Sequence, residues 1–149
     1  PVALAALQAG ATWLGVARSS EALELRQAGI TCPILLLGYT PEAHISEMIA
    51  NRVSLTIWNM DQVKQISALA AQSGQNARLH LKVDTGMSRL GVQVNQADTL
   101  AKKIDDEPNI YFEGIFTHFA RADEADTATT DAQESRLLEL IATLGKHGI

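Results

Sequence analysis

The residues of this chain whose types and spacing suggest chemistry lie in one stretch, RLHLKVDTGMSRLG (Arg78–Gly91). Read as a β-strand, the stretch alternates, because successive side chains point to opposite faces. Leucine and valine occupy one face, and the other carries Arg78, His80, Lys82 and Asp84. A strand of an α/β domain is normally buried on both faces, so a lysine and a histidine there are costly unless each finds a partner. This polar row is the first indication of a functional site.

Two cations, Lys82 and Arg89, lie close together in this stretch, and they repel each other unless an anion or a chemical change intervenes. At ~4 Å and an effective dielectric constant of about 20, a unit pair is worth about 4 kcal/mol, so the sign of one charge decides the arrangement. Asp84-Thr85-Gly86 ends the strand with turn-forming residues and leads to Arg89. We interpret the pair as functional; ordinary ion pairs of Asp84 with Lys82 or Arg89 are the structural alternative.

The histidines and the cysteine add one further candidate. His118 follows an expected strand, although a lone histidine is more often a satisfied core residue. His44 and His147 are expected on helix surfaces, and Cys32, in an apolar strand, is expected in the core. No His, Cys or acidic residues show the spacing of metal ligands, so no metal is expected.

The overall composition is typical of one ordinary globular domain. The chain has 149 residues, of which 46% are hydrophobic and 19% charged, and no apolar run approaches the ~20 residues of a membrane span. A net charge of -5 argues against nucleic acid or a membrane as the main partner. The single cysteine and the lack of a visible secretory leader favour a cytoplasmic protein.

Helical patterns alternate with short apolar runs along the whole chain. Strands are expected at residues 13–17, 34–37, 53–57, 78–84 and 110–117. The helices between them are expected to begin at capping residues, namely Ser19 or Ser20, Thr40 and Asn59. Gly74 is expected to end the helix that Asn59 begins.

Five strands that alternate with helices predict a parallel α/β sheet with right-handed crossovers. A doubly wound sheet and a (β/α)8 barrel both fit this order, but the GxGxxG turn of a dinucleotide fold is missing. The polar residues Lys82–Arg89 and His118 follow strand ends, where barrels keep their active sites. We therefore expect a TIM-type (β/α)8 barrel. A whole barrel takes ~250 residues, so about five of its eight strands would lie in this chain, with no domain boundary inside residues 1–149.

Two motifs resemble those of alanine racemases, fold-type III enzymes that use pyridoxal 5'-phosphate. They are HLKVDTGMSRLGV (His80–Val92) and FEGIFTHFARADEAD (Phe112–Asp126). The run LGVARSSEALELRQAGITCPILLLG (Leu14–Gly38) also matches, but less specifically. The resemblance covers essentially the entire chain. It implies an enzyme that interconverts L-alanine and D-alanine, supplies D-alanine for cell-wall peptidoglycan, and works as a cytoplasmic homodimer.

The resemblance also implies that parts of such an enzyme lie outside residues 1–149. No motif like KANAYGHG, which carries the Schiff-base lysine of the family, occurs in the sequence. We expect the chain to begin after the strand with that lysine. We also expect it to end before the C-terminal β domain, whose tyrosine serves as the second base. On this interpretation neither base belongs to the chain, which is expected to be inactive alone.

Three supporting roles follow from the resemblance, and a fourth follows from the residues of the turn. Arg89 resembles the arginine that donates to the phenolic oxygen of the cofactor and lies near the substrate carboxylate, and His118 resembles the histidine beside the cofactor. Lys82 resembles the lysine that is carbamylated in many of these enzymes, a change that turns its repulsion by Arg89 into attraction. Asp84 and Met87 are expected to shape the turn that presents Arg89.

Other interpretations stay open on the sequence alone. The chain could be a truncated barrel module that binds cofactor or amino acid without turning it over, or part of a relative that acts on serine. The motif HLKVDTGMSRLG matches other fold-III proteins, such as amino-acid decarboxylases or small cofactor carriers, poorly. The complete open reading frame would separate the first possibility from a racemase.

Overall fold

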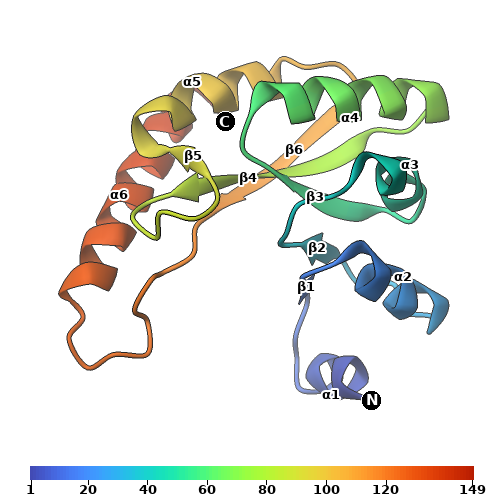
Figure 1. Cartoon of the computed structure of the whole chain (residues 1–149), viewed down its shortest axis with the longest axis horizontal. Coiled ribbons are helices and arrows are strands. Elements are labelled where there is room, and N and C mark those ends of the chain that lie inside the picture. The colour runs from blue at the N-terminus through green and yellow to red at the C-terminus, as the bar shows by residue number, and fades with distance from the viewer.

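Six parallel strands form one sheet in the computed structural model, which describes residues 1–149 (Figure 1). The strands are β1 (Leu14–Val16), β2 (Ile34–Leu36), β3 (Val53–Ile57), β4 (Ala77–Asp84), β5 (Val92–Gln93) and β6 (Ile110–Phe116). The helices are α1 (Val2–Gln8), α2 (Ser19–Gln27), α3 (Glu42–Ala50), α4 (Met60–Ser73), α5 (Val94–Asp105) and α6 (Ala128–Gly145). None of these helices combines the length and the apolar composition that a membrane crossing requires.

The order of the strands in the sheet follows the chain. Strands β1, β2, β3, β4 and β6 are neighbours in that sequence, and β5 pairs in parallel with the carboxyl end of β4. A doubly wound sheet would reverse its order part-way, whereas a barrel adds each strand beside the previous one. The prediction of a parallel α/β sheet in barrel order is confirmed, and only the two-residue strand β5 was not predicted.

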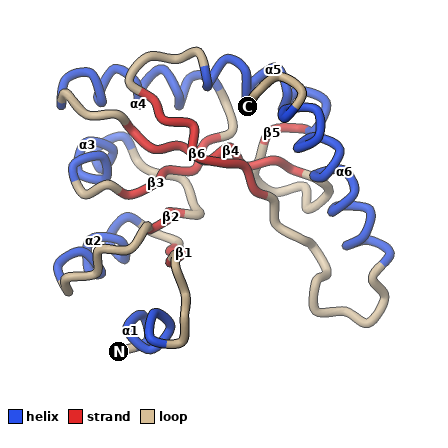
Figure 2. The backbone as a smooth tube through the Cα atoms, turned by 180° about the vertical axis from the view of Figure 1, so that it is seen from behind, coloured by secondary structure: helices blue, strands red, loops and turns tan.

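The helices lie on one side of the sheet. Figure 2 shows α2 to α6 along the outside of an arc, with the strands on its inside. We call the helix-covered side the outer face and the other side the inner face. The core lies between the outer face and the helices, where Leu79, Leu81 and Val83 of β4 are at most 1% exposed. On the same strand, His80 and Lys82 belong to the inner face, so the predicted alternation of β4 is confirmed.

Helix α4 begins and ends at the predicted residues. The side chain of Asn59 accepts the backbone N–H of Gln62, and the side chain of Gln62 returns the contact to the backbone of Asn59. Gly74 ends the helix in the left-handed conformation, with φ at 66°. Both signals are local, because each depends on residues within one helical turn.

The predicted caps of α2 and α3 are wrong. Arg18 is the N-cap residue of α2, and the carboxylate of Glu21 accepts the backbone N–H groups of Ala17 and Arg18. Ser19 already lies inside the helix, and its hydroxyl contacts Nδ1 of His44 instead. Helix α3 is capped by Pro41 without a side-chain hydrogen bond. The hydroxyl of Thr40 is buried in the core and has no hydrogen-bond partner.

Candidate functional site

The five residues that the sequence singled out lie together at the carboxyl ends of β4 and β6. A small hollow there is lined by Lys82, Val83, Asp84, Met87, Arg89, Leu90 and His118. Three of these seven residues belong to β4, one follows β6, and the others come from the turn that joins β4 to β5. Parallel strands end at one edge of the sheet, so residues far apart in the chain meet at this edge.

The turn after β4 is held by the carboxylate of Asp84. Its Oδ1 accepts the backbone N–H of Gly86 at 3.0 Å and that of Ser88 at 2.9 Å. The chain then folds back so closely that a Cβ on Gly91 would lie 2.6 Å from the backbone nitrogen of Asp84. Only glycine fits at such a close approach with a φ of +135°. The turn thereby places Arg89 beside the end of β4.

Lys82 is a buried cation without a partner. It is 5% exposed, and its Nζ lies 5.4 Å from the centre of the Phe116 ring, with no hydrogen bond to another group of the chain. Burial lowers the pKa of Lys82, and the nearby charge of Arg89 lowers it further, while Asp84 acts in the opposite direction. Neither ion pair of the structural alternative is present, because none of the chain's ion pairs joins Asp84 to Lys82 or Arg89.

Arg89 and His118 offer free polar groups at the hollow. Both residues are exposed, and the guanidinium of Arg89 takes part in none of the ion pairs of the chain. A guanidinium presents several donors in a fixed plane and stays charged, so it suits an incoming carboxylate or phenolate. Arg89 is therefore free to pair with an anion, and His118 is free to make a hydrogen bond, at this edge of the sheet.

Sequence reasoning missed a buried amide beneath the hollow. Gln133 of α6 is 1% exposed and contacts the turn after β4 and the segment after β6. A signal was present, because Gln133 occupies a position of the apolar row that continues with Leu137, Leu140 and Leu144 at helical spacing. A glutamine in the buried row of a helix requires hydrogen-bond partners, and its partners here belong to the site.

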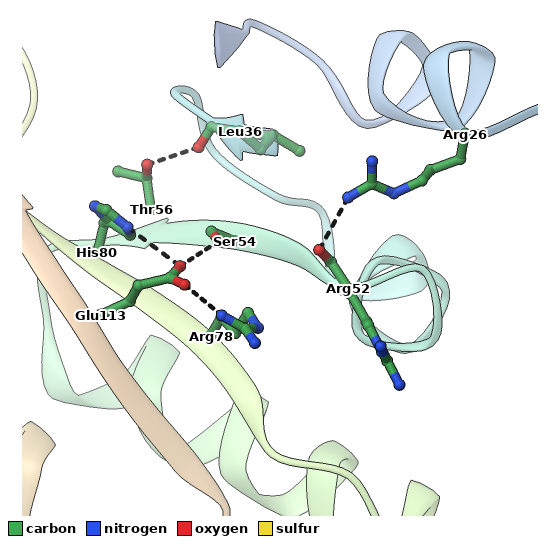
Figure 3. Close-up of polar contacts among 8 residues, drawn as sticks. All are labelled: Arg26, Leu36, Arg52, Ser54, Thr56, Arg78, His80 and Glu113. Carbon is green, nitrogen blue, oxygen red and sulfur yellow. Dashed lines mark hydrogen bonds and ion pairs between the residues drawn. The ribbon is translucent and has the colours of Figure 1, made fainter. Parts of the chain in front are cut away.

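A second polar cluster lies on the inner face at the amino end of the same strands (Figure 3). The carboxylate of Glu113, which is 9% exposed, accepts a hydrogen bond from Ser54 and pairs with Arg78 at 2.5 Å. Nε2 of His80 lies 3.3 Å from the same carboxylate. Burial lowers the pKa of His80, and the charge of Glu113 opposes this effect. The cluster joins β3, β4 and β6.

A bulge in β6 brings Glu113 into this cluster. Leu79 pairs with Phe112 and His80 pairs with Gly114, so Glu113 is the extra residue between two regular pairs. Gly114 leaves the space that the imidazole occupies, since a Cβ there would lie 3.1 Å from Cε1 of His80. Glu113 is not among the predicted site residues, although a carboxylate inside the strand sequence IYFEGIF is a visible signal.

The comparison with known families agrees with these features. Residues 1–149, the whole chain, match the family model described as alanine racemase, N-terminal domain. The chain belongs to the alanine racemase family. This family consists of isomerases, so the predicted enzyme class is confirmed at the level of the family.

Curated alanine racemases match the chain over its whole length. The chain is 46% identical over 145 residues to the alanine racemase of Methanococcus maripaludis, a match that covers 96% of this chain and 39% of that relative. It is also 46% identical over 151 residues to the alanine racemase of Desulforamulus reducens, where the match covers 100% of this chain and 40% of the relative. The chain thus spans about two fifths of the length of these relatives.

Solved structures of alanine racemases superpose closely on the chain. The enzyme of Clostridium difficile 630 in complex with cycloserine gives a TM-score of 0.94 at 36% identity, covering 99% of this chain and 41% of that one. The enzyme of Bacillus anthracis with bound L-Ala-P gives 0.87 at 38% identity, covering 100% and 39%. The likeness confirms that the parallel sheet and its outer helices have the arrangement found in alanine racemases.

Proposed function

We propose that the protein containing this chain interconverts L-alanine and D-alanine with pyridoxal 5'-phosphate. The family assignment supports this proposal, and one observation of the site supports it most directly. An unpaired arginine, Arg89, stands beside a buried and unpaired lysine, Lys82, at the carboxyl ends of parallel strands. Two unpaired cations side by side destabilise the folded chain, whereas they would stabilise a bound anionic ligand.

The residues of the hollow fit this cofactor. When bound, pyridoxal phosphate withdraws electrons from the α-carbon of an amino acid and so acidifies its proton. We propose that the guanidinium of Arg89 donates to the phenolic oxygen of the cofactor and lies near the substrate carboxylate. His118 adds a hydrogen-bonding group from the end of β6. Asp84 and Met87 support this arrangement through the turn that carries Arg89.

We also propose that Lys82 is carbamylated. Its lowered pKa leaves more of the amine neutral, and a neutral Nζ can attack carbon dioxide. The ammonium first loses one proton to solvent; the attack then forms an N–C bond, opens one C–O π bond of carbon dioxide and releases a second proton, so a positive side chain becomes a negative one. The repulsion between Lys82 and Arg89 then becomes attraction. Labelled bicarbonate should give a carbamate signal in the protein that Lys82→Met removes; a plain ammonium at high bicarbonate would contradict this proposal.

The remaining parts of the proposal concern the whole protein. The greater length of the relatives supports a division in which residues 1–149 form part of the N-terminal barrel domain. The Schiff-base lysine and the tyrosine that serves as the second base then come from other segments. We further propose a cytoplasmic homodimer that supplies D-alanine for peptidoglycan, and we prefer alanine to serine as substrate because the curated relatives are alanine racemases.

Racemisation by the protein from the complete reading frame tests the proposal. Purified protein loaded with pyridoxal phosphate should convert L-alanine into D-alanine faster than it converts serine. Arg89→Lys keeps the charge but loses the planar donors, and we expect kcat/KM to fall about a hundredfold. Arg52→Lys, at the exposed residue before β3, is the matched control and should leave kcat/KM unchanged. Cofactor binding without turnover would contradict the proposed activity.

A further inference from the structure

We infer that Gln133 is a positioning residue for the proposed racemase site, an inference that rests on the proposed function. Its buried amide joins the turn that carries Arg89 to the segment that carries His118, and so holds the two groups in one relative geometry. The residue lies in α6, the last helix, and takes no part in the hollow itself. It therefore acts through its neighbours and makes no contact with the reacting atoms.

The side chain of Gln133 uses every hydrogen-bonding group that it has. Nε2 donates to Oγ1 of Thr85 at 3.1 Å and to the backbone carbonyl of His118 at 3.2 Å. Oε1 accepts the backbone N–H of Ala120 at 2.9 Å. The partners determine the orientation of the amide, because a backbone N–H needs an acceptor and a carbonyl needs a donor. A flipped amide would lose both backbone contacts.

The hydrogen bonds continue from Thr85 into the sheet, and each group donates to the next one along the series. Oγ1 of Thr117 donates to the carbonyl of Val83 at 2.8 Å, which uses its only proton. Oγ1 of Thr85, 2.8 Å away, must therefore donate to Thr117 and accept from Gln133. The chain Gln133–Thr85–Thr117–Val83 thus ties α6 to the ends of both β4 and β6. Removing the first donor leaves Oγ1 of Thr85 without its hydrogen bond from α6.

Helix α6 also packs directly on the turn. A Cβ on Gly86 would lie 3.3 Å from Cγ of Gln133 and 3.1 Å from the guanidinium of Arg136, which donates to the carbonyl of Thr85. The imidazole of His118 has no hydrogen bond within the chain, so its position depends on the backbone that Gln133 holds. A long loop separates β6 from α6 (Figure 1), and Gln133 fixes the start of that loop.

The test compares two variants of Gln133 with a matched control in the protein from the complete reading frame. Gln133→Leu keeps the size of the side chain and removes all three hydrogen bonds. Gln133→Glu keeps the acceptor for Ala120, but its ionised form cannot donate to Thr85 or His118. Ser67→Ala is the control, since it removes one buried hydrogen bond, to the carbonyl of Pro108 at 2.7 Å, at the opposite end of the sheet.

Two measurements separate positioning from mere stability. The first is kcat/KM per cofactor-loaded site, which loss of folded protein does not change. A misplacement of about 1 Å costs up to a hundredfold, so we expect Gln133→Leu to lose about tenfold to a hundredfold, with Ser67→Ala unchanged. The second is backbone hydrogen exchange, which should quicken in residues 84–90 and 117–120 of Gln133→Leu and in neither segment of Ser67→Ala.

Gln133→Glu keeps the inference falsifiable if Gln133→Leu does not fold. Burial raises the pKa of a carboxyl group, and the protonated acid regains one donor. The kcat/KM of Gln133→Glu relative to the wild type should therefore recover as the pH falls. A folded, loaded variant with wild-type kcat/KM would overturn the inference while leaving the proposed function intact. If the wild type does not racemise alanine, the proposed function fails. Separately, unchanged hydrogen exchange of Gln133→Leu in residues 84–90 and 117–120 would refute the role of Gln133.

Discussion

Asp84 and Ser88 are joined by a hydrogen bond that runs back along the chain, from the backbone N–H of Ser88 to Oδ1 of Asp84 at 2.9 Å. Ser88 has a φ of 57°, a left-handed conformation that costs a non-glycine residue about 1–2 kcal/mol. The carboxylate offsets this cost and holds the turn in the conformation that brings Arg89 to the hollow with Lys82. This acceptor atom therefore contributes to the position of Arg89.

Replacing Asp84 separates the role of its acceptor from that of its charge. Asp84→Asn keeps an Oδ1 for Gly86 and Ser88, whereas Asp84→Ala leaves both N–H groups without it. We expect the alanine variant to lose about 1–2 kcal/mol of stability and the asparagine variant to lose less than half of that. Thermal denaturation and racemisation rates check both variants. Equal losses would show that the charge, and not the turn geometry, is what matters.

Lys82→Met should stabilise the protein at neutral pH. Because the folded state lowers the pKa of Lys82, it binds this proton less well than the unfolded chain does. The resulting destabilisation of the folded state is fully present below the folded-state pKa of Lys82. It disappears as the pH rises through the pKa of an ordinary lysine, about 10.4. Thermal denaturation without added bicarbonate should show a gain for Lys82→Met that shrinks toward that pH. A gain that is independent of pH would point to packing instead.

Glu113→Gln should weaken the fold and change its response to acid. The variant loses the ionic contact with Arg78, and we expect a cost of about 1 kcal/mol because that guanidinium is partly exposed. It also removes the charge that opposes the lowering of the pKa of His80. The pKa of His80 in the folded state then lies still further below its value in the unfolded chain. The free energy of unfolding therefore falls over a longer pH interval as the pH drops below about 6.5.

Ser54→Ala is the control for this effect. It removes one hydrogen bond to the same carboxylate but leaves the charge of Glu113 in place. Thermal denaturation between neutral and mildly acidic pH should show the extended loss in Glu113→Gln and not in Ser54→Ala. Identical pH profiles of the two variants would refute the coupling between Glu113 and His80.

Thr40→Val tests the corrected start of α3. The hydroxyl of Thr40 is buried without a partner, so replacing it by a methyl group of similar size removes a desolvation penalty. We expect a gain of about 1 kcal/mol in thermal or urea denaturation. A helix cap at Thr40 would instead make Thr40→Val destabilising by a similar amount, so the sign of the change decides between the two.

The sequence alone was sufficient for α4 and for β4, where the deciding contacts lie within a few residues, although the equally local cap of α2 was missed. The cap of α4 at Asn59 depends on Gln62, three residues away, and the left-handed Gly74 depends on its missing side chain. The alternation of β4 follows from the geometry of any strand, so it correctly placed His80 and Lys82 on the inner face. The motifs of the turn after β4 and of the strand that ends before His118 also indicated the family.

The tertiary structure determined the contacts between residues that lie far apart in the sequence. Glu113 meets His80 only because a bulge shifts the pairing of β4 with β6, and no local pattern encodes that shift. Gln133 reaches Thr85 across 48 residues, and its role depends on how α6 packs on the sheet. Thr40 had the pattern of a cap but is buried instead. Local preferences are worth about 1 kcal/mol each, so core packing and strand register override them wherever the two disagree.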